Sequence, residues 1–175
     1  MNSKEFSDIL KKENIDMKQI PELLVSKLKE NHMKIATAES CTGGMLSKEI
    51  TTVSGASIVF DCGVCSYANE IKNKVLGVSS KALSDFGAVS KEVAVEMARG
   101  VRKLANADIG VSTTGIAGPT GGTKEKPVGL VYVGISTENE EFFEKLLLND
   151  KDYNREEIRE MATYIALYIA FSKIS

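Results

Sequence analysis

The spacing of apolar residues changes along this chain between a helical and a strand-like period, and these changes predict the order of its elements. Residues 4–31 have a helical pattern in two pieces, broken near Asp16 and Pro21, and Leu23, Leu24 and Leu28 form an apolar stripe on the second piece. Short apolar runs predict strands at 33–38, 57–66, 108–114, 128–137 and 141–148. Further helices are predicted at about 43–53, 70–76, 80–87, 91–105 and 154–172.

Polar residues at the helix starts support these boundaries. Asn69, Ser79 and Ser90 each stand where a side-chain oxygen can accept from a free N–H group of the first helical turn. For the long helix at 91–105, the expected core-facing residues are Val93, Val95, Met97, Ala98, Val101 and Leu104.

The order of these elements predicts an α/β fold. It favours a three-layer α/β/α sandwich around a mixed sheet, in which the last two strands form an antiparallel hairpin around Glu138-Asn139-Glu140. We find no internal repeat and no second domain boundary. We therefore divide the chain into an N-terminal helical extension at 1–19 and one α/β domain at 20–175.

Composition and charge argue against several classes of function. With 43% apolar and 26% charged residues, the chain of 175 residues has the composition of an ordinary soluble globular protein. A net charge of −2 gives no electrostatic argument for binding a nucleic acid or an anionic membrane. No apolar stretch is long enough to span a bilayer, and the N-terminus lacks a signal-peptide pattern, so we expect the protein in the cytoplasm.

The cysteines predict neither a disulfide framework nor a metal site. Their number, three, is odd. Cys62 and Cys65 form a C-x-x-C within a predicted strand, where residues three apart point to opposite faces, whereas a redox C-x-x-C opens a helix. A structural zinc ion needs four ligands, and the chain offers only Cys41 and His32 besides this pair. We therefore interpret the cysteines as small buried hydrophobic residues.

The junction between the first strand and the next helix is a candidate site. Its sequence is Thr37-Ala38-Glu39-Ser40-Cys41-Thr42-Gly43-Gly44. A hydroxyl at such a junction faces the free N–H groups and the dipole of the helix N-terminus, which favour developing negative charge. Gly43 and Gly44 allow the backbone to approach a ligand closely. The segment thus fits a nucleophile or an anion site; alternatively, Ser40 and Thr42 only cap the helix.

A glycine-rich loop follows the strand at 108–114. Its sequence is Thr113-Thr114-Gly115-Ile116-Ala117-Gly118-Pro119-Thr120-Gly121-Gly122-Thr123. Ligands of α/β sheets bind outside the carboxyl ends of strands, and the N–H groups and hydroxyls of this loop can hold a phosphate. The loop is not a P-loop, because the Gly-Lys-Ser/Thr ending is absent, and it is not a dinucleotide fingerprint, because no helix follows it. The alternative is a flexible connector.

Tyr67 and Lys72 form a further candidate site. Tyr67 stands at the end of a predicted strand, and Lys72 stands in the first turn of the next helix. A lysine there lies against the helix dipole, which lowers its proton affinity, so Lys72 can act as the general base for a serine. The alternative is an ordinary solvated surface lysine.

Separated motifs of the chain together resemble one known family. They are Thr37 to Gly44, Tyr67-Ala68-Asn69-Glu70 with Lys72, Gly87-Ala88-Val89-Ser90, and Thr114-Gly115-Ile116-Ala117-Gly118-Pro119-Thr120-Gly121-Gly122. In this order they resemble the C-terminal domain family of the competence/damage-inducible protein CinA, also known as nicotinamide-nucleotide amidase. The resemblance covers about residues 20–172. Larger members carry an additional N-terminal pyrophosphatase-like domain, whereas this chain resembles the stand-alone amidase form.

The resemblance implies a hydrolase that converts nicotinamide mononucleotide to nicotinate mononucleotide and ammonia, without a metal or a cofactor. It implies a serine nucleophile with lysine and tyrosine partners, which match Ser40, Lys72 and Tyr67. Backbone N–H groups at 41–44 would stabilise the oxyanion, and Glu39 would fix this loop or pair with Lys72. The implied substrate-binding residues are Glu39, Cys41, Thr42, Gly43, Gly44, Thr114, Gly115, Ala117, Gly118, Gly121, Gly122 and Arg155.

Two arginines at the start of the last helix match an arginine pair of the family. Arginine suits bidentate binding of phosphate, and Arg155 is the better candidate of the two. For Arg159, the alternative is a surface ion pair with Glu156 or Glu160.

Two other functions fit the same residues. In a regulatory module that binds a nucleotide without turnover, Ser40 and Lys72 would bind phosphate. A hydrolase of a related amide or nucleotide would use the same three side chains as the amidase. In each case the partner is a small molecule, with no nucleic acid and no membrane, and a homodimer is expected from the resemblance.

Overall fold

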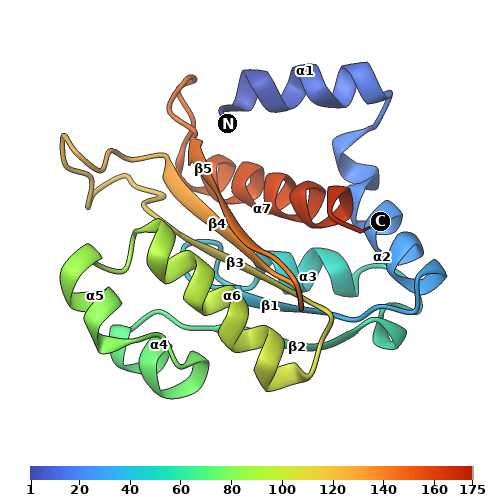
Figure 1. The fold of residues 1–175 in the computed structure, drawn as a ribbon. Coiled ribbons are helices and arrows are strands. Elements are labelled where there is room, and N and C mark those ends of the chain that lie inside the picture. The colour runs from blue at the N-terminus through green and yellow to red at the C-terminus, as the bar shows by residue number, and fades with distance from the viewer. Residues whose placement is uncertain (175) are drawn as a thin grey trace.

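In the computed structural model, which describes residues 1–174, the chain forms a five-stranded sheet with the order β2-β1-β3-β4-β5 (Figure 1). The strands are β1 (Ile35–Glu39), β2 (Phe60–Cys65), β3 (Ile109–Gly115), β4 (Leu130–Ser136) and β5 (Glu141–Leu147). β1 pairs in parallel with β2 and β3, whereas β4 pairs antiparallel with both β3 and β5. The predicted mixed sheet with an antiparallel hairpin is therefore confirmed.

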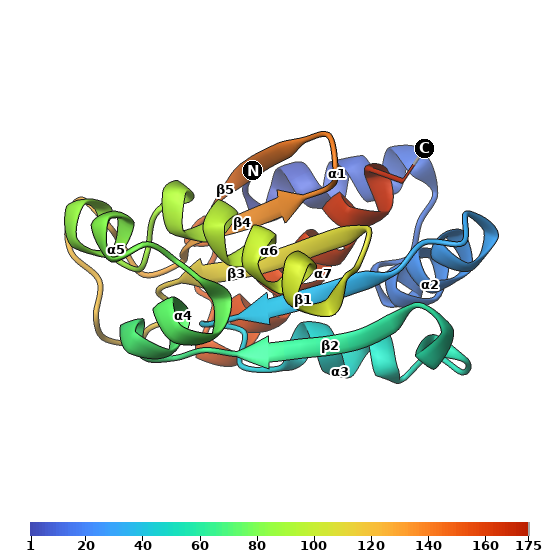
Figure 2. The same ribbon diagram turned by 60° about the horizontal axis from the view of Figure 1, so that its bottom comes forward.

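Helices cover both faces of this sheet (Figures 1 and 2). One face carries α4 (Asn69–Leu76), α5 (Ser80–Phe86) and α6 (Lys91–Ala105), and the other carries α2 (Ile20–Glu30), α3 (Met45–Thr51) and α7 (Arg155–Ser172). A larger hydrophobic core fills the space under α2, α3 and α7, and a smaller one fills the space under α4, α5 and α6. The three-layer α/β/α sandwich is confirmed, and the helices on both faces explain why β1 and β3 are buried without alternation.

The N-terminal helix α1 (Ser3–Glu13) packs beside α7. Phe6 is fully buried and meets the edge of the Tyr168 ring, with the two ring centroids 5.5 Å apart. The Met1 ammonium donates to a side-chain oxygen of Glu144 on β5 at 3.0 Å. The first residues are thus part of the larger hydrophobic core and do not project from it.

Most predicted boundaries are confirmed within a few residues. The break near Asp16 is present, and Ser79 and Ser90 cap α5 and α6 as predicted. Short 3-10 helices lie at η1 (Met17–Gln19) and η2 (Ala56–Ile58). The prediction that Asn69 caps α4 is wrong, because the helix starts at Asn69 itself and no side chain caps it. The prediction that Leu104 faces the core is also wrong. This residue lies in the last turn of α6, at the edge of the helical layer, and is 54% exposed.

β2 is an edge strand of the sheet, and its side chains alternate between the two faces. Cys62 and Cys65 therefore point to opposite faces, as predicted for this C-x-x-C. The interpretation of Cys65 as a buried residue is wrong, because an edge strand is covered incompletely and this thiol is exposed. Among residues 1–174, no group of three His, Cys, Asp or Glu side chains could hold a metal ion.

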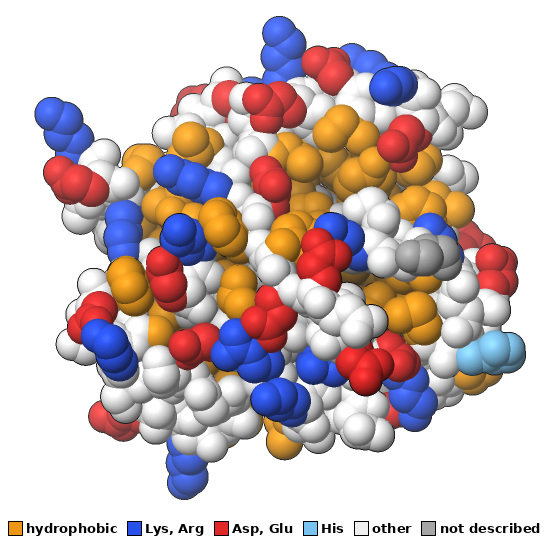
Figure 3. Space-filling view, viewed as in Figure 1, with side chains coloured by type: hydrophobic (Ala, Val, Ile, Leu, Met, Phe, Trp, Pro, Cys, Tyr) orange, Lys and Arg blue, Asp and Glu red, His pale blue; other side chains and the backbone are white. Residues whose placement is uncertain are grey.

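Charged side chains of both signs are mixed over the face of the molecule shown in Figure 3. One ion pair is bidentate: Arg99 on α6 donates to both carboxylate oxygens of Glu141 on β5, each at 2.6 Å. None of the helices within the described residues combines the length and the apolar character that crossing a membrane requires.

Candidate active site

The predicted site segments meet at one end of the sheet, where the parallel strands finish (Figure 2). Because β1, β2 and β3 are parallel, their carboxyl ends lie on the same side, and Ser40, Ser66 and the loop at 116–129 follow these ends directly. The first turns of α4 and α7 bring Lys72 and Arg155 to the same edge. Segments that are far apart in the sequence therefore form one site.

Lys72 contacts the hydroxyl group of Ser40. Its Nζ lies 3.2 Å from Ser40 Oγ, 2.7 Å from the carbonyl oxygen of Ser66 and 3.3 Å from the carbonyl oxygen of Tyr67. Lys72 is only 1% exposed, so the interpretation as a solvated surface lysine is wrong. The amine is held in one place by three oxygen atoms, one of which belongs to the candidate nucleophile.

Burial lowers the pKa of Lys72 from its ordinary value, and Cys41 nearby has a smaller, opposite effect. Burial is therefore the main cause of the lowered pKa, an effect that the sequence did not suggest. Within residues 1–174, no carboxylate accepts a hydrogen bond from Nζ. A neutral amine can donate its two N–H groups to the two carbonyl oxygens, which leaves its lone pair facing the Ser40 hydroxyl. This is the arrangement of a general base beside its nucleophile.

Tyr67 and Arg155 lie at the mouth of the site. Tyr67 is 68% exposed, and its hydroxyl accepts from Arg155 Nη2 at 3.0 Å. Nη1 of the same arginine donates to the carbonyl oxygen of Gly118 at 2.6 Å. Tyr67 contacts Lys72 through its backbone, and in the described part of the chain its hydroxyl bonds to neither Lys72 nor Ser40. Arg155 thus connects α7, Tyr67 and the glycine-rich loop.

Glu39 organises the loop that follows β1. Its fully buried carboxylate accepts hydrogen bonds of 2.8–3.0 Å from the N–H groups of Gly44, Leu46 and Ser47 and from the hydroxyls of Thr42 and Ser47. The carboxylate thereby satisfies the free N–H groups at the start of α3 and complements the helix dipole. Of the two roles suggested for Glu39, the structure gives the fixing of the loop, since Lys72 is not among its partners.

Because Glu39 caps α3, the hydroxyls of Ser40 and Thr42 do not. The Ser40 hydroxyl contacts Lys72, and the Thr42 hydroxyl donates to Glu39 at 2.8 Å. The interpretation that these two residues only cap the helix is therefore wrong. The N–H groups at the helix start are also occupied, so a phosphate cannot bind to them.

Backbone N–H groups remain free in the loop itself. Across the described residues, those of Cys41, Thr42 and Gly43 donate to no protein acceptor, whereas the N–H group of Gly44 is bonded to Glu39. Gly43 and Gly44 have φ angles of +60° and +97°, a left-handed conformation that favours glycine. The free N–H groups at 41–43 are the candidates for binding an oxyanion.

Arg159 bonds the opposite side of the same loop. Its Nε donates to the carbonyl oxygen of Cys41 at 3.2 Å, and Nη2 donates to that of Thr42 at 2.9 Å. Nη1 pairs with Glu156 at 2.7 Å, so the predicted ion pair is confirmed. Sequence reasoning missed the two carbonyl contacts, because Arg159 and Thr42 are 117 positions apart.

Several predicted substrate-binding residues have buried side chains. Burial raises the pKa of the Cys41 thiol to about 12, so the thiol stays protonated at neutral pH and is not a nucleophile. Thr114 is fully buried, and its hydroxyl donates to a backbone carbonyl of the α5–α6 connection at 2.7 Å. Ala117 is also buried, whereas Gly121 and Gly122 are exposed. Among these residues, only the exposed glycines are accessible to a ligand from solvent.

The glycine-rich loop is attached to the rest of the site at both ends. At its start, a Cβ on Gly115 would lie 2.6 Å from the carbonyl oxygen of Leu130, so the close approach requires glycine. Near its end, Lys126 Nζ donates to the carbonyl oxygens of Phe86 and Val89, both at 2.8 Å. Sequence reasoning missed Lys126, because a lysine in a polar loop gives no local signal of partners on another element.

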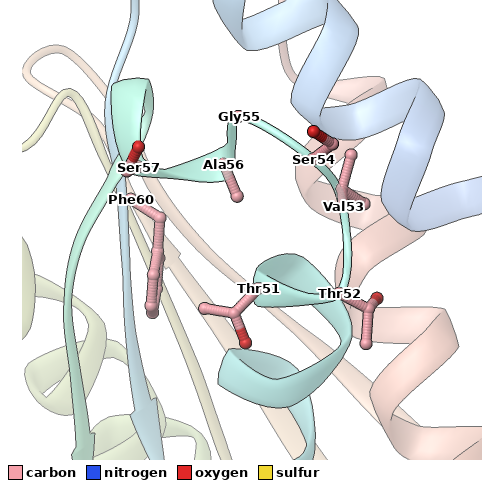
Figure 4. A pocket seen from close by; sticks show the side chains of 8 residues that line it. All are labelled: Thr51, Thr52, Val53, Ser54, Gly55, Ala56, Ser57 and Phe60. Carbon is pink, nitrogen blue, oxygen red and sulfur yellow. The ribbon is translucent and has the colours of Figure 1, made fainter.

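A hollow of about 440 Å³ lies elsewhere, between the end of α3 and the start of β2 (Figure 4). Its lining residues are Thr51, Thr52, Val53, Ser54, Gly55, Ala56, Ser57 and Phe60. They stand at the amino end of β2, whereas Ser40 lies at the carboxyl ends of the parallel strands. None of these lining residues has a titratable side chain. This hollow therefore does not belong to the candidate active site.

The fold and the site together define a class of protein: a three-layer α/β domain with a serine and a buried lysine at the carboxyl edge of its parallel strands. The matches to known proteins then give the family. Residues 17–174 match the family model of the CinA C-terminal domain, and the chain belongs to this family.

Individual relatives agree with this assignment. A competence-damage inducible protein of Thermoanaerobacter sp. (strain X514) is 55% identical over 155 residues, and a CinA-like protein of Kosmotoga olearia is 50% identical over 148 residues. These matches cover 89% and 85% of this chain but 37% and 35% of the relatives, so the chain spans little more than a third of their length.

Solved structures agree as well. The competence/damage inducible protein CihA of Agrobacterium tumefaciens is 36% identical with a TM-score of 0.84, covering 90% of this chain and 96% of that chain. A CinA superfamily protein of Enterobacter cloacae is 29% identical with a TM-score of 0.85, covering 92% and 94%.

Proposed function

We propose that this chain hydrolyses the carboxamide of nicotinamide mononucleotide, giving nicotinate mononucleotide and ammonia. The observation that carries the proposal is the contact between the buried amine of Lys72 and Ser40 Oγ at 3.2 Å. A buried amine without a carboxylate partner favours its neutral form, and a neutral amine activates a serine. The substrate comes from the resemblance of the site motifs to the amidase form of the family.

In this reaction, neutral Lys72 takes the proton of Ser40 as the serine oxygen attacks the carboxamide carbon. The negative charge that develops on the carboxamide oxygen is stabilised by the free N–H groups at 41–43. Lys72 then returns the proton to the departing ammonia. Water, activated by the same amine, hydrolyses the ester on Ser40 and releases the acid product.

The mononucleotide part of the substrate would bind at the mouth of the site. Arg155 lies there between Tyr67 and the glycine-rich loop, and a guanidinium suits bidentate binding of phosphate. Gly121 and Gly122 are exposed in the same loop and offer backbone N–H groups. The Tyr67 hydroxyl, held by Arg155, would contact the mononucleotide there, while Lys72 supplies the proton for the leaving ammonia.

The test is ammonia release by the purified chain from nicotinamide mononucleotide, with nicotinamide, the dinucleotide and glutamine as comparison substrates. We expect release from the mononucleotide alone. Release from one of the other amides alone would reassign the substrate. Calorimetric binding of the mononucleotide without release would favour a nucleotide-binding regulatory module and overturn the amidase proposal.

The burial of Lys72 predicts how this reaction depends on pH. Because only the neutral amine accepts the proton of Ser40, kcat/KM is expected to rise about tenfold per pH unit below the lowered pKa and to level off above it. Cys41 does not contribute to this rise, because its pKa is raised to about 12. Initial rates across the range in which circular dichroism is constant measure the profile. A kcat/KM that falls as the pH rises would show that Lys72 is not the base.

A further inference from the structure

Arg159 holds two successive carbonyl groups of the loop after Ser40. Nε bonds the Cys41 oxygen at 3.2 Å, and Nη2 bonds the Thr42 oxygen at 2.9 Å. The remaining contact is an ion pair with the exposed Glu156. Such a pair has little effect on its own, so the two carbonyl bonds are the contribution of Arg159 to this loop.

These two bonds also fix the direction of two N–H groups. A trans peptide group is planar, and its C=O points opposite to the N–H of the next residue. Because the Cys41 oxygen points to Arg159, the N–H of Thr42 points away from it, and the N–H of Gly43 does so for the same reason. α7 lies on one face of the sheet, and α4, which carries Lys72, packs on α6 on the other face (Figure 2). N–H groups that point away from Arg159 therefore point away from α7 and toward the face that carries Lys72.

Both N–H groups are also without a protein acceptor over the described residues, whereas those of Ser40 and Gly44 are bonded within the protein. The loop is shaped to fit the guanidinium, since a Cβ on Gly43 would lie 3.1 Å from Arg159 Nη2. Gly43 has a φ angle of +60°, which also disfavours any larger residue. The contact between Arg159 and the loop therefore requires a residue without a Cβ at position 43.

We propose that Arg159 is a positioning residue that holds the N–H groups of Thr42 and Gly43 as the oxyanion donors of the reaction at Ser40. The inference rests on the proposed function, since it requires acyl transfer to this serine. The two arginines of α7 then have different roles. Arg155 contacts the substrate at the mouth of the site, so its loss raises KM, whereas the loss of Arg159 lowers kcat.

Arg159→Ala is expected to lower kcat for ammonia release by about 100-fold and to leave KM within about twofold, because oxyanion donors act in the transition state. Arg159→Lys should show the same loss, because one ammonium cannot span two carbonyls as a guanidinium fork does. Added guanidinium ion should restore part of the kcat of Arg159→Ala, and methylammonium should not. The matched control is Glu156→Gln, which removes only the ion pair and should keep kcat within about twofold.

A second readout is independent of the nicotinamide substrate. An alkyl fluorophosphonate forms a bond between Ser40 Oγ and phosphorus, fluoride leaves, and the serine proton passes to Lys72. The phosphoryl oxygen takes the place of the oxyanion, so labelling, followed by intact-protein mass spectrometry, should be about tenfold slower or more in Arg159→Ala. Labelling of the parent without ammonia release would reject the proposed function, and slower labelling of the variant would still support the role of Arg159. A parent that is not labelled at all would overturn both.

A raised KM with unchanged kcat, or labelling at the parent rate, would assign Arg159 to substrate binding and overturn the inference. If circular dichroism shows that Arg159→Ala does not fold, Gly43→Ala carries the test. Its Cβ displaces Nη2 from the loop side, so kcat should fall while KM stays constant. An unchanged kcat in that variant would equally contradict the positioning role.

Discussion

Ser40→Ala is expected to lower ammonia release from nicotinamide mononucleotide by roughly 10⁴-fold or more. Within residues 1–174, the substitution removes the only side-chain oxygen that Lys72 Nζ contacts, since its other two partners are backbone carbonyls. The residual rate would come from binding and from the free N–H groups of the loop, as in serine hydrolases that lose their nucleophile. Steady-state kinetics with direct detection of ammonia measures the loss.

The matched control for this variant is Ser57→Ala. Ser57 is an exposed serine near the amino ends of the parallel strands, away from the candidate active site. Its replacement should keep kcat within about twofold. Ser40→Ala should still bind the mononucleotide, because the proposed phosphate contacts lie at Arg155 and the glycine-rich loop. If Ser40→Ala keeps about a tenth or more of the parent kcat, a loss of less than about 1.4 kcal/mol, another group is the nucleophile.

The order of strands and helices could be predicted from the sequence because local patterns decide it. β1 and β3 begin with apolar residues and are buried on both faces, and α6 has a serine cap followed by apolar residues every three or four positions. Details that depend on neighbouring elements were wrong. Asn69 is as good a cap by type as Ser90, yet the chain enters α4 one residue earlier, so its side chain has no capping role.

The candidate site could be predicted only in part. The sequence places Ser40 and Lys72 next to element ends, but it does not give the burial of the amine, which depends on the carbonyl groups of Ser66 and Tyr67 around Nζ. Arg159 is one of several charged residues in the first turns of an amphipathic helix. Its carbonyl partners lie 117 and 118 positions earlier, and only the packing of α7 against the sheet brings them together.

Glu39→Ala is expected to lower the free energy of unfolding by about 3–5 kcal/mol, because several buried donors lose their acceptor at once. The donors are backbone N–H groups of the loop and of the first turn of α3, together with two hydroxyls. The start of α3 also loses the negative charge that complements its dipole. For a chain of this length, such a loss lowers the melting temperature by about 10 °C. Urea unfolding followed by circular dichroism measures the free energy.

Glu39→Gln separates the charge of this side chain from its shape. It keeps one acceptor oxygen but turns an NH2 group toward N–H donors, so an intermediate loss of about 1–3 kcal/mol is expected. Glu144→Ala is the surface control, since its partly exposed pair with the Met1 ammonium contributes about 1 kcal/mol or less. Equal losses in Glu39→Ala and Glu144→Ala would mean that water replaces the buried carboxylate. In that case only the contacts with α7 would hold the loop in place. Arg159→Ala would then lower the free energy of unfolding more than Glu39→Ala.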